Sequence, residues 1–307
     1  MRALLLSNPK ATATSGRVRE VITSALAADL KLDIVHTTHR GHAIELGTQA
    51  TQDGYDYVVV VGGDGTVNEV VNGMLAGGPG AHVPTLAVVP GGSANVFART
   101  LGLSNNPIDA TGQILEALQE GRSRSIGLGN VDGRWFVFAA GFGFDAEVIH
   151  KVELRRGRGK KATPHLYART AVKNFYRSGL RKEPPMALHV PGQDPIDGLY
   201  LAVVSNTTPW TYFNSRPVQV SPEARFETAL DVFALKRTRT PSTLRTLWQI
   251  TRVDPQPRGK KVRSFHDLGA FTITSTEPIE LQVDGDFAGL REIAHFTGVP
   301  NALRVIA

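Results

Sequence analysis

Short apolar runs alternate with stretches of helical spacing through residues 1–121. The apolar runs are rich in valine, leucine and isoleucine, as in strands buried on both faces, and lie at residues 3–6, 32–36, 58–61 and 86–89. Helical patterns lie at residues 15–26, 43–49, 66–75, 96–101 and 109–118. This alternation predicts a doubly wound, Rossmann-like parallel sheet, whose ligands bind beyond the carboxyl ends of the strands. The loops containing Asn8, Thr38, Gly63 and Ser93 are expected at that edge.

After Gly121 the pattern changes to short strands separated by proline and glycine, which predicts an antiparallel β-sandwich. A β-hairpin with a type I′ turn is expected at Asp132-Gly133. Further strands are expected at 186–190, 199–204, 218–220, 229–235, 271–275 and 279–283, and helices at 145–154, 165–176 and 243–250. The boundary is placed near Arg124. This gives an α/β domain over residues 1–124 and a β-sandwich domain over 125–290, with 291–307 as a stretch that could return to the first domain.

The strand at 58–61 leads through Gly62-Gly63-Asp64-Gly65 into a helix. Thr66 and Glu69 have the spacing of a capping box, which predicts that this helix starts at Thr66. Glycines let the backbone approach an anion, and a helix N-terminus favours negative charge. The turn is therefore a candidate phosphate site, with a metal ion or a substrate hydroxyl between Asp64 and the phosphate. An ordinary tight turn with an exposed Asp64 is the alternative.

A second glycine turn, Pro90 to Asn95, follows the next strand. Ser93 could donate a hydrogen bond to a phosphate oxygen, and Asn95 could orient a substrate. Alternatively, Ser93 caps the following helix. Two glycine turns at one sheet edge indicate a phosphate site more strongly than either turn alone.

Two carboxylates flank a glycine at Asp284-Gly285-Asp286. A hydroxyl that attacks a phosphoryl group needs a base, and two nearby acids could act as base and orienter. A surface Asp-Gly turn is the alternative. Asp145 follows a glycine pair that lacks the third glycine of a dinucleotide fingerprint, so this residue is either a helix cap or a site residue.

The composition of the chain excludes several classes of ligand and of protein. The 307 residues carry 34 Lys and Arg against 28 Asp and Glu, a net charge of +6 that fits an anionic ligand or membrane surface and is too weak to indicate nucleic acid. Basic runs at 151–161 and 258–263 could meet an anionic leaflet or be solvated loops. The absence of cysteine excludes disulfides and thiolate sites. No apolar run is long enough to span a bilayer, and the N-terminal run is too short for a signal peptide, so a cytoplasmic protein is expected.

The run from Gly62 to Glu69 resembles the signature of the diacylglycerol kinase catalytic domain family, which includes bacterial soluble lipid kinases, sphingosine kinases and ceramide kinases. Its first four residues alone are shared with NAD kinases and phosphofructokinases. Further resemblances extend over nearly the whole chain: Asn8-Pro9-Lys10, Thr38 with Gly41-His42-Ala43, Pro90 to Asn95 with Phe97-Ala98-Arg99, Gly143 to Ala146, and Asp284-Gly285-Asp286.

The resemblance implies an ATP cleft between an α/β domain and a β-sandwich that receives a lipid. The nucleotide-contacting residues that it implies are Asn8, Thr38, Gly62, Gly63, Asp64, Gly65, Thr66, Asn68, Glu69, Ser93 and Asn95. Asp284 would be the general base for the lipid hydroxyl, with Asp286 in support where glutamate is usual. Asp64 would organise the catalytic Mg²⁺.

Three positions depart from the family pattern. Ser93 stands where threonine is commoner, Val96 where aspartate is frequent, and Glu227-Thr228 where an Asp-Gly pair supplies a structural magnesium ligand. Glu227 is thus a candidate metal ligand at an altered site, and these positions do not assign the lipid.

The function implied is that of an ATP-dependent lipid kinase of phospholipid biosynthesis, which phosphorylates a hydroxyl of diacylglycerol or a related lipid. Its expected location is cytoplasmic and peripheral at an anionic membrane, with a homodimer left open. Two other readings stay open: a kinase of a soluble substrate such as NAD, and a nucleotide-binding regulator without catalysis.

Overall fold

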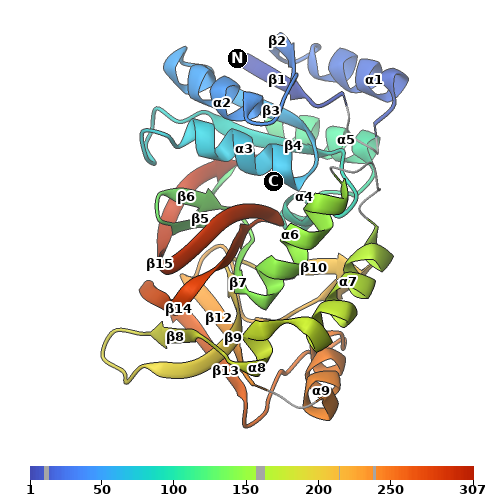
Figure 1. The fold of residues 1–307 in the computed structure, drawn as a ribbon. Coiled ribbons are helices and arrows are strands. Elements are labelled where there is room, and N and C mark those ends of the chain that lie inside the picture. Colours follow the sequence, from blue (N-terminus) through green and yellow to red (C-terminus); the bar gives the residue numbers. More distant parts are fainter. Residues whose placement is uncertain (10–13, 157–162, 214, 238–239) are drawn as a thin grey trace. The chain divides into compact units, whose positions relative to one another are not determined.

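The computed structural model describes residues 1–9, 14–156, 163–213, 215–237 and 240–307 (Figure 1). It divides into two compact units, the first containing residues 1–128 and 300–307 and the second residues 129–299. The chain passes between them twice, through strand β5 (Arg124–Val131) and strand β15 (Asp286–Val305).

The first unit contains a parallel sheet in the order β2-β1-β3-β4, and β4 also pairs with the end of β15. The bounds are β1 (Arg2–Ser7), β2 (Lys31–His36), β3 (Tyr57–Gly62) and β4 (Thr85–Pro90). All of β4 is buried, as are Val58 to Val61 of β3. This agrees with the β-branched apolar runs, because a central parallel strand is covered on both faces.

Five helices connect these strands: α1 (Gly16–Leu26), α2 (His42–Gln52), α3 (Asp64–Met74), α4 (Val96–Thr100) and α5 (Pro107–Gln119). Helices α2 and α3 pack closely because Gly73 carries no side chain, and a Cβ there would lie 2.0 Å from the Ile44 carbonyl oxygen. The expected start of α3 at Thr66 is wrong, since the helix begins at Asp64. Similarly, α5 is capped by Asn106 and not by Asp109.

The second unit contains an antiparallel sheet in the order β13-β12-β9-β7-β14-β15, in which β8 pairs with β14 and β9. Its bounds are β7 (Ala139–Gly143), β8 (Met186–His189), β9 (Ile196–Ser205), β12 (Leu230–Lys236), β13 (Val262–Leu268) and β14 (Ala270–Val283). Strand β6 (Arg134–Phe136) pairs with β5, and β10 (Thr211–Phe213) with β11 (Arg216–Val218).

The hairpin predicted at Asp132-Gly133 is confirmed, because both residues have positive φ (49° and 87°) and Val131 pairs with Arg134. Two other expectations are wrong in detail. The runs at 271–275 and 279–283 form the single strand β14, whose register shifts between them, and β13 was not predicted.

The helices of the second unit lie where they were predicted: α6 (Phe144–Arg156), α7 (Pro164–Arg177) and α9 (Thr240–Ile250), with the short α8 (Gly179–Lys182) in addition. Aromatic residues fill the core of this unit, where Phe296 stacks on Phe271 with ring centroids 5.1 Å apart and meets Phe136 edge-on. No described helix is both long and apolar enough to cross a bilayer.

Candidate active site

The two glycine turns of the first unit touch each other through their backbones. The Gly91 N–H donates to the Gly62 carbonyl oxygen at 2.8 Å. A Cβ built on Gly92 would lie 2.7 Å from the Gly63 Cα, and one on Gly63 would lie 3.1 Å from the Gly92 Cα. The contact therefore explains why both positions lack a side chain, and it places the turns after β3 and β4 together at the carboxyl edge of the sheet.

Asp64 joins the same two turns. Its carboxylate accepts hydrogen bonds from the backbone N–H groups of Val96 (3.1 Å) and Phe97 (3.2 Å), in the first turn of α4. Burial raises the pKa of Asp64, while the N–H groups of residues 95–97 act in the opposite direction. Asp64 thus caps α4, and the alternative in which Ser93 caps this helix is wrong. Ser93 is exposed.

Asn95 shapes the second glycine turn. It is 2% exposed and has a left-handed backbone (φ 48°). Its side chain accepts from the Gly92 N–H (2.8 Å) and donates to the Gly92 carbonyl (3.0 Å) and to Asn105 Oδ1 (2.8 Å). The side chain is therefore turned into the loop, and the expectation that it orients a substrate directly is not supported by this geometry.

Loops from β1 and β2 reach the same edge. Asn8 Nδ2 donates to Thr66 Oγ1 (3.2 Å), and the Gly41 N–H donates to Glu69 Oε1 (3.1 Å). Glu69 therefore ties the loop before α2 to α3, so the predicted capping box with Thr66 does not form. Thr38 Oγ1 lies 2.9 Å from His39 Nδ1 and 3.1 Å from His42 Nδ1 in that same loop.

Asn68, within the glycine-turn signature, faces inward. It is 1% exposed, and its carbonyl and carboxamide oxygens accept hydrogen bonds from Asn72 Nδ2 within α3. Gly62 is also buried, whereas Gly63, Gly65 and Thr66 are partly exposed. The surface available to a ligand therefore includes these last three residues, the equally part-exposed Asp64, and Ser93.

Asp284 and Gly285 form a tight turn in the second unit. Their φ angles are 48° and 83°, and Val283 pairs with Asp286, which is the pattern of a two-residue type I′ hairpin. The turn is not at the surface, since Asp284 is 4% exposed. Asp284 Oδ2 accepts from the Val137 N–H (2.7 Å), and Oδ1 accepts from Phe138 and Ala139 (both 3.0 Å). Three N–H donors hold this carboxylate in place and stabilise its negative charge.

A second buried carboxyl group supports that turn. Gln282 Oε1 accepts from the Gly285 N–H, and Gln282 Nε2 donates to Asp145 Oδ2, each at 2.9 Å. Asp145 lies in the first turn of α6, is 7% exposed, and burial raises its pKa to about 6. A Cβ on Gly141 would lie 2.0 Å from Asp145 Oδ2, so the glycine makes room for this carboxyl.

Carboxylates suited to Mg²⁺ are present singly. Across the described ranges, no group of three or more His, Cys, Asp and Glu side chains is arranged to hold a metal ion. Glu227 is exposed between β11 and β12, and Asp64 lies beside the glycine turns. Mg²⁺ commonly binds one or two carboxylates and completes its shell with substrate phosphates and water, so such single donors fit a metal that arrives with a nucleotide.

Residues 2–131 match the family model described as the diacylglycerol kinase catalytic domain. The match includes both glycine turns and Asp64. This part of the chain, which is less than half of it, is therefore similar to the diacylglycerol kinase catalytic domain family. Within the family segment, the contact of Gly63 with Gly92 joins the two motifs that carry the resemblance.

Two named relatives resemble the chain over different lengths. A diacylglycerol kinase of Bacillus subtilis is 34% identical over 157 residues, which are 49% of this chain, and the chain spans about half (48%) of that relative. A diacylglycerol kinase of Staphylococcus carnosus is 26% identical over 301 residues, covering 94% of this chain and 89% of the relative.

Solved structures share the fold. A crystal structure of a diacylglycerol kinase from Bacillus anthracis superposes with a TM-score of 0.72 at 21% identity, covering 99% of this chain and 96% of that one. Another structure from the same organism gives a TM-score of 0.76 at 22% identity. The mixed α/β fold is therefore the one found in these proteins.

Proposed function

We propose that this protein is an ATP-dependent lipid kinase that transfers a phosphoryl group to a hydroxyl of diacylglycerol or a related lipid. The observation that carries the proposal is the joined pair of glycine turns, linked by the Gly63–Gly92 contact and by Asp64, inside a segment that matches the kinase catalytic domain. Relatives named diacylglycerol kinase support the choice of acceptor.

The glycine turns would hold the phosphates of the nucleotide. The N-terminus of α3 has positive dipole character, and its N-cap residue is Gly63, which has no side chain to cap it. The phosphates would contact the part-exposed residues Gly63, Gly65 and Thr66. The exposed Ser93 hydroxyl could donate a hydrogen bond to a phosphate oxygen. Bound Mg²⁺ would neutralise charge on the phosphates. Asp64 is the carboxylate proposed to organise it, and Glu227 is proposed as a ligand at a separate, structural metal site.

The Asp284 turn would prepare the acceptor. The lipid hydroxyl oxygen forms a bond to the γ-phosphorus, the bond from that phosphorus to the ADP leaving oxygen breaks, and the hydroxyl proton passes to a carboxylate. Asp284 is the proposed base and Asp286 its neighbour in support. The hydrogen bonds from residues 137–139 fix the orientation of the Asp284 carboxylate, as a base in a rigid site requires.

The domains follow from the same proposal. Residues 1–124 would form the Rossmann-like nucleotide domain, and residues 125–290 a β-sandwich that receives the lipid. A cytoplasmic location at the membrane surface and a part in phospholipid biosynthesis belong to this proposal, as does the possibility of a homodimer.

The deciding experiment supplies γ-labelled ATP and Mg²⁺ with diacylglycerol in mixed micelles, and in parallel with NAD and sugar phosphates. Labelled phosphatidate is the expected product. Label in a soluble acceptor would instead identify a kinase of the NAD kinase class, and ATP binding without transfer to any acceptor would identify a regulator.

Two variants serve as controls for this assay. Ser93→Ala removes an exposed hydroxyl and should raise KM for ATP without changing the melting temperature. Gly63→Val should abolish transfer, because its Cβ would meet Gly92 at 3.1 Å. Label transfer at the wild-type rate in Gly63→Val would count against the assignment of this turn to the nucleotide.

A further inference from the structure

Helix α9 turns an apolar face to solvent. Leu244, Leu247 and Trp248 are 60%, 50% and 59% exposed and lie three and four positions apart, on one side of the helix. The buried side contains Thr246 and Gln249 together with Ile250. A surface helix of a soluble protein normally presents its polar face to water, so this arrangement is the reverse of the usual one.

The apolar face continues beyond the helix. Val253 is fully exposed, at 102% of its reference area. The Arg252 guanidinium lies 4.5 Å from the centroid of the Trp248 ring, so a cation sits directly on the largest exposed apolar side chain.

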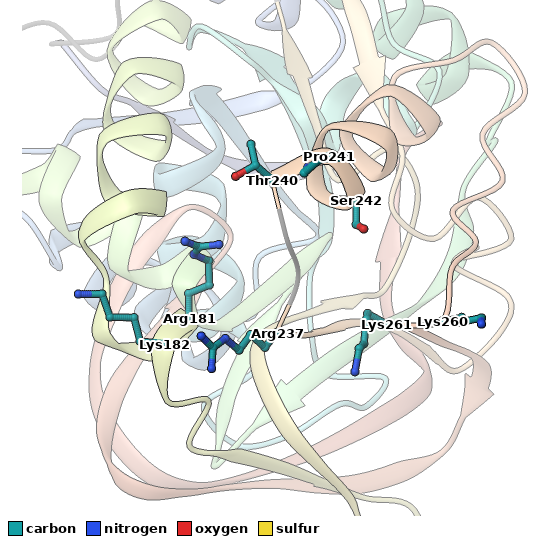
Figure 2. A pocket seen from close by; sticks show the side chains of 8 residues that line it. All are labelled: Arg181, Lys182, Arg237, Thr240, Pro241, Ser242, Lys260 and Lys261. Carbon is teal, nitrogen blue, oxygen red and sulfur yellow. The ribbon is translucent and has the colours of Figure 1, made fainter.

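A cavity of about 800 Å³ opens at the start of α9. Figure 2 shows cationic side chains from three separate segments around it: Arg181 and Lys182 of α8, Arg237 after β12, and Lys260 and Lys261 before β13. Thr240, Pro241 and Ser242 of α9 complete the lining, and no acid is among the described residues that line it. Glu183, which directly follows the lining residue Lys182, is exposed.

The other basic run is engaged differently. Arg155 donates to Thr170 Oγ1 at 2.7 Å, and Lys151 pairs with Glu147 and with Asn174. These contacts tie α6 to α7 and fix the two cations within that helix pair. Residues 157–162 of the run lie outside the described ranges.

We infer that the exposed face of α9 and the cation-lined cavity beside it together form a docking surface for an anionic lipid bilayer. At the boundary between acyl chains and phosphate headgroups, apolar side chains can contact the acyl chains while neighbouring lysine and arginine side chains contact the phosphates. An acidic protein would satisfy the cations but would not require Leu244, Leu247, Trp248 and Val253 to be exposed. The inference rests on the proposed function only in that a lipid kinase must reach a bilayer.

This surface is separate from the Asp284 turn. At one end of β12 the Lys236 N–H donates to the Lys261 carbonyl, beside the cavity. At the other end Asp231 pairs with Ser205, which pairs in turn with Ala139, a donor to Asp284. Five residues of strand separate the ends, or roughly 17 Å at ~3.4 Å per residue. Substitutions in the surface can therefore be made without touching the proposed chemistry.

The test measures binding to sedimented vesicles without ATP or diacylglycerol, so that its result does not depend on kinase activity. Phosphatidylcholine vesicles with and without phosphatidylglycerol are compared at low and high salt. Wild type should bind the anionic vesicles, and salt should weaken this binding. The Lys260→Ala/Lys261→Ala double variant should bind them roughly 25-fold more weakly, because each cation contributes about a fivefold factor near an anionic leaflet.

The control and the companion variant separate charge from apolar contact. Arg17→Ala/Lys31→Ala removes two exposed cations of the first unit and should leave vesicle binding within about twofold of wild type. Leu247→Ser/Trp248→Ser should weaken vesicle binding at both salt concentrations, whereas it should not change binding to soluble polyglutamate.

Vesicle binding that is unaffected in both α9-region variants would overturn the inference. So would polyglutamate binding as tight as vesicle binding and insensitive to Leu247→Ser/Trp248→Ser, because this would indicate an acidic protein partner. Loss of vesicle binding in the variants, with micelle-dispersed diacylglycerol still phosphorylated at the wild-type rate, would support it. If wild type binds vesicles but phosphorylates no lipid, the docking surface stands and the proposed function fails.

Discussion

Replacing Asp145 by asparagine tests whether the second unit carries a buried carboxyl group that is unfavourable when charged. The carboxyl is 7% exposed, and burial raises its pKa from 3.8 to about 6. Because the folded state binds this proton more tightly than the unfolded state, the contribution to stability is fully present below pH ~4 and is lost as pH rises through about 6. At ~1.36 kcal/mol per tenfold change, the loss is about 3 kcal/mol.

Asparagine keeps the shape and an oxygen that can accept from Gln282 Nε2, but it cannot ionise. The free energy of unfolding of Asp145→Asn, relative to wild type, should therefore rise by about 3 kcal/mol between pH 4 and pH 8. Comparing the two proteins at each pH cancels the titration of the other acids.

The assay is urea denaturation followed by tryptophan fluorescence. Trp135, Trp210 and Trp248 are the only tryptophans in the sequence and all lie in the second unit, so the signal reports the unit that contains Asp145. A difference between variant and wild type that is the same at pH 4 and pH 8, within ~0.5 kcal/mol, would refute the assignment of Asp145 as a carboxyl with a raised pKa.

Two further substitutions test the turns. Asp284→Ala leaves three buried N–H groups without their acceptor and should lower the free energy of unfolding by about 3–5 kcal/mol in the same fluorescence assay. Asp194→Ala, at an exposed turn, should change it by less than ~0.5 kcal/mol, and equal values for the two variants would contradict the structural role of Asp284. Gly92→Ala places a Cβ 2.7 Å from the Gly63 Cα and should weaken ATP binding by an order of magnitude or more in calorimetry. Gly112→Ala, where a Cβ meets nothing within 4 Å, is its control, and matching ATP affinities in the two variants would show that contact between the turns is irrelevant to the nucleotide.

Local sequence patterns were sufficient where the cause of a structure is local. The Asp132-Gly133 hairpin was predictable because both turn residues must adopt positive φ, and few other residues do so at low cost. The helix beginning after Ser15 was predictable because its cap donor, the Val18 N–H, is three residues away. The positions of the two glycine turns were predictable because each apolar strand run is followed closely by glycines.

What could not be predicted depends on partners that are distant in the chain. Asp64 caps a helix that begins 32 residues later, and Asp284 is held by amides more than 140 residues away. Glu69 has the spacing of a capping box, but its partner is the N–H of Gly41, 28 residues earlier. In each case a tertiary contact sets the hydrogen-bond partner, and spacing along the sequence does not reveal it. The glycine at 141 was a local signal that a neighbouring side chain needed space.

Strand β4 receives its last partner from the far end of the chain. Val305 pairs with Leu86, and the Ile306 N–H donates to the Leu86 carbonyl, both within the first unit. On a ribosome, residues 1–128 are therefore made long before the segment that completes their sheet. Until residues 300–307 emerge, one edge of a wholly buried strand has no backbone partner from β15, and such an edge can pair with a neighbouring nascent chain. A chain that stops before residue 300 should therefore be more prone to aggregation than the full 307-residue chain.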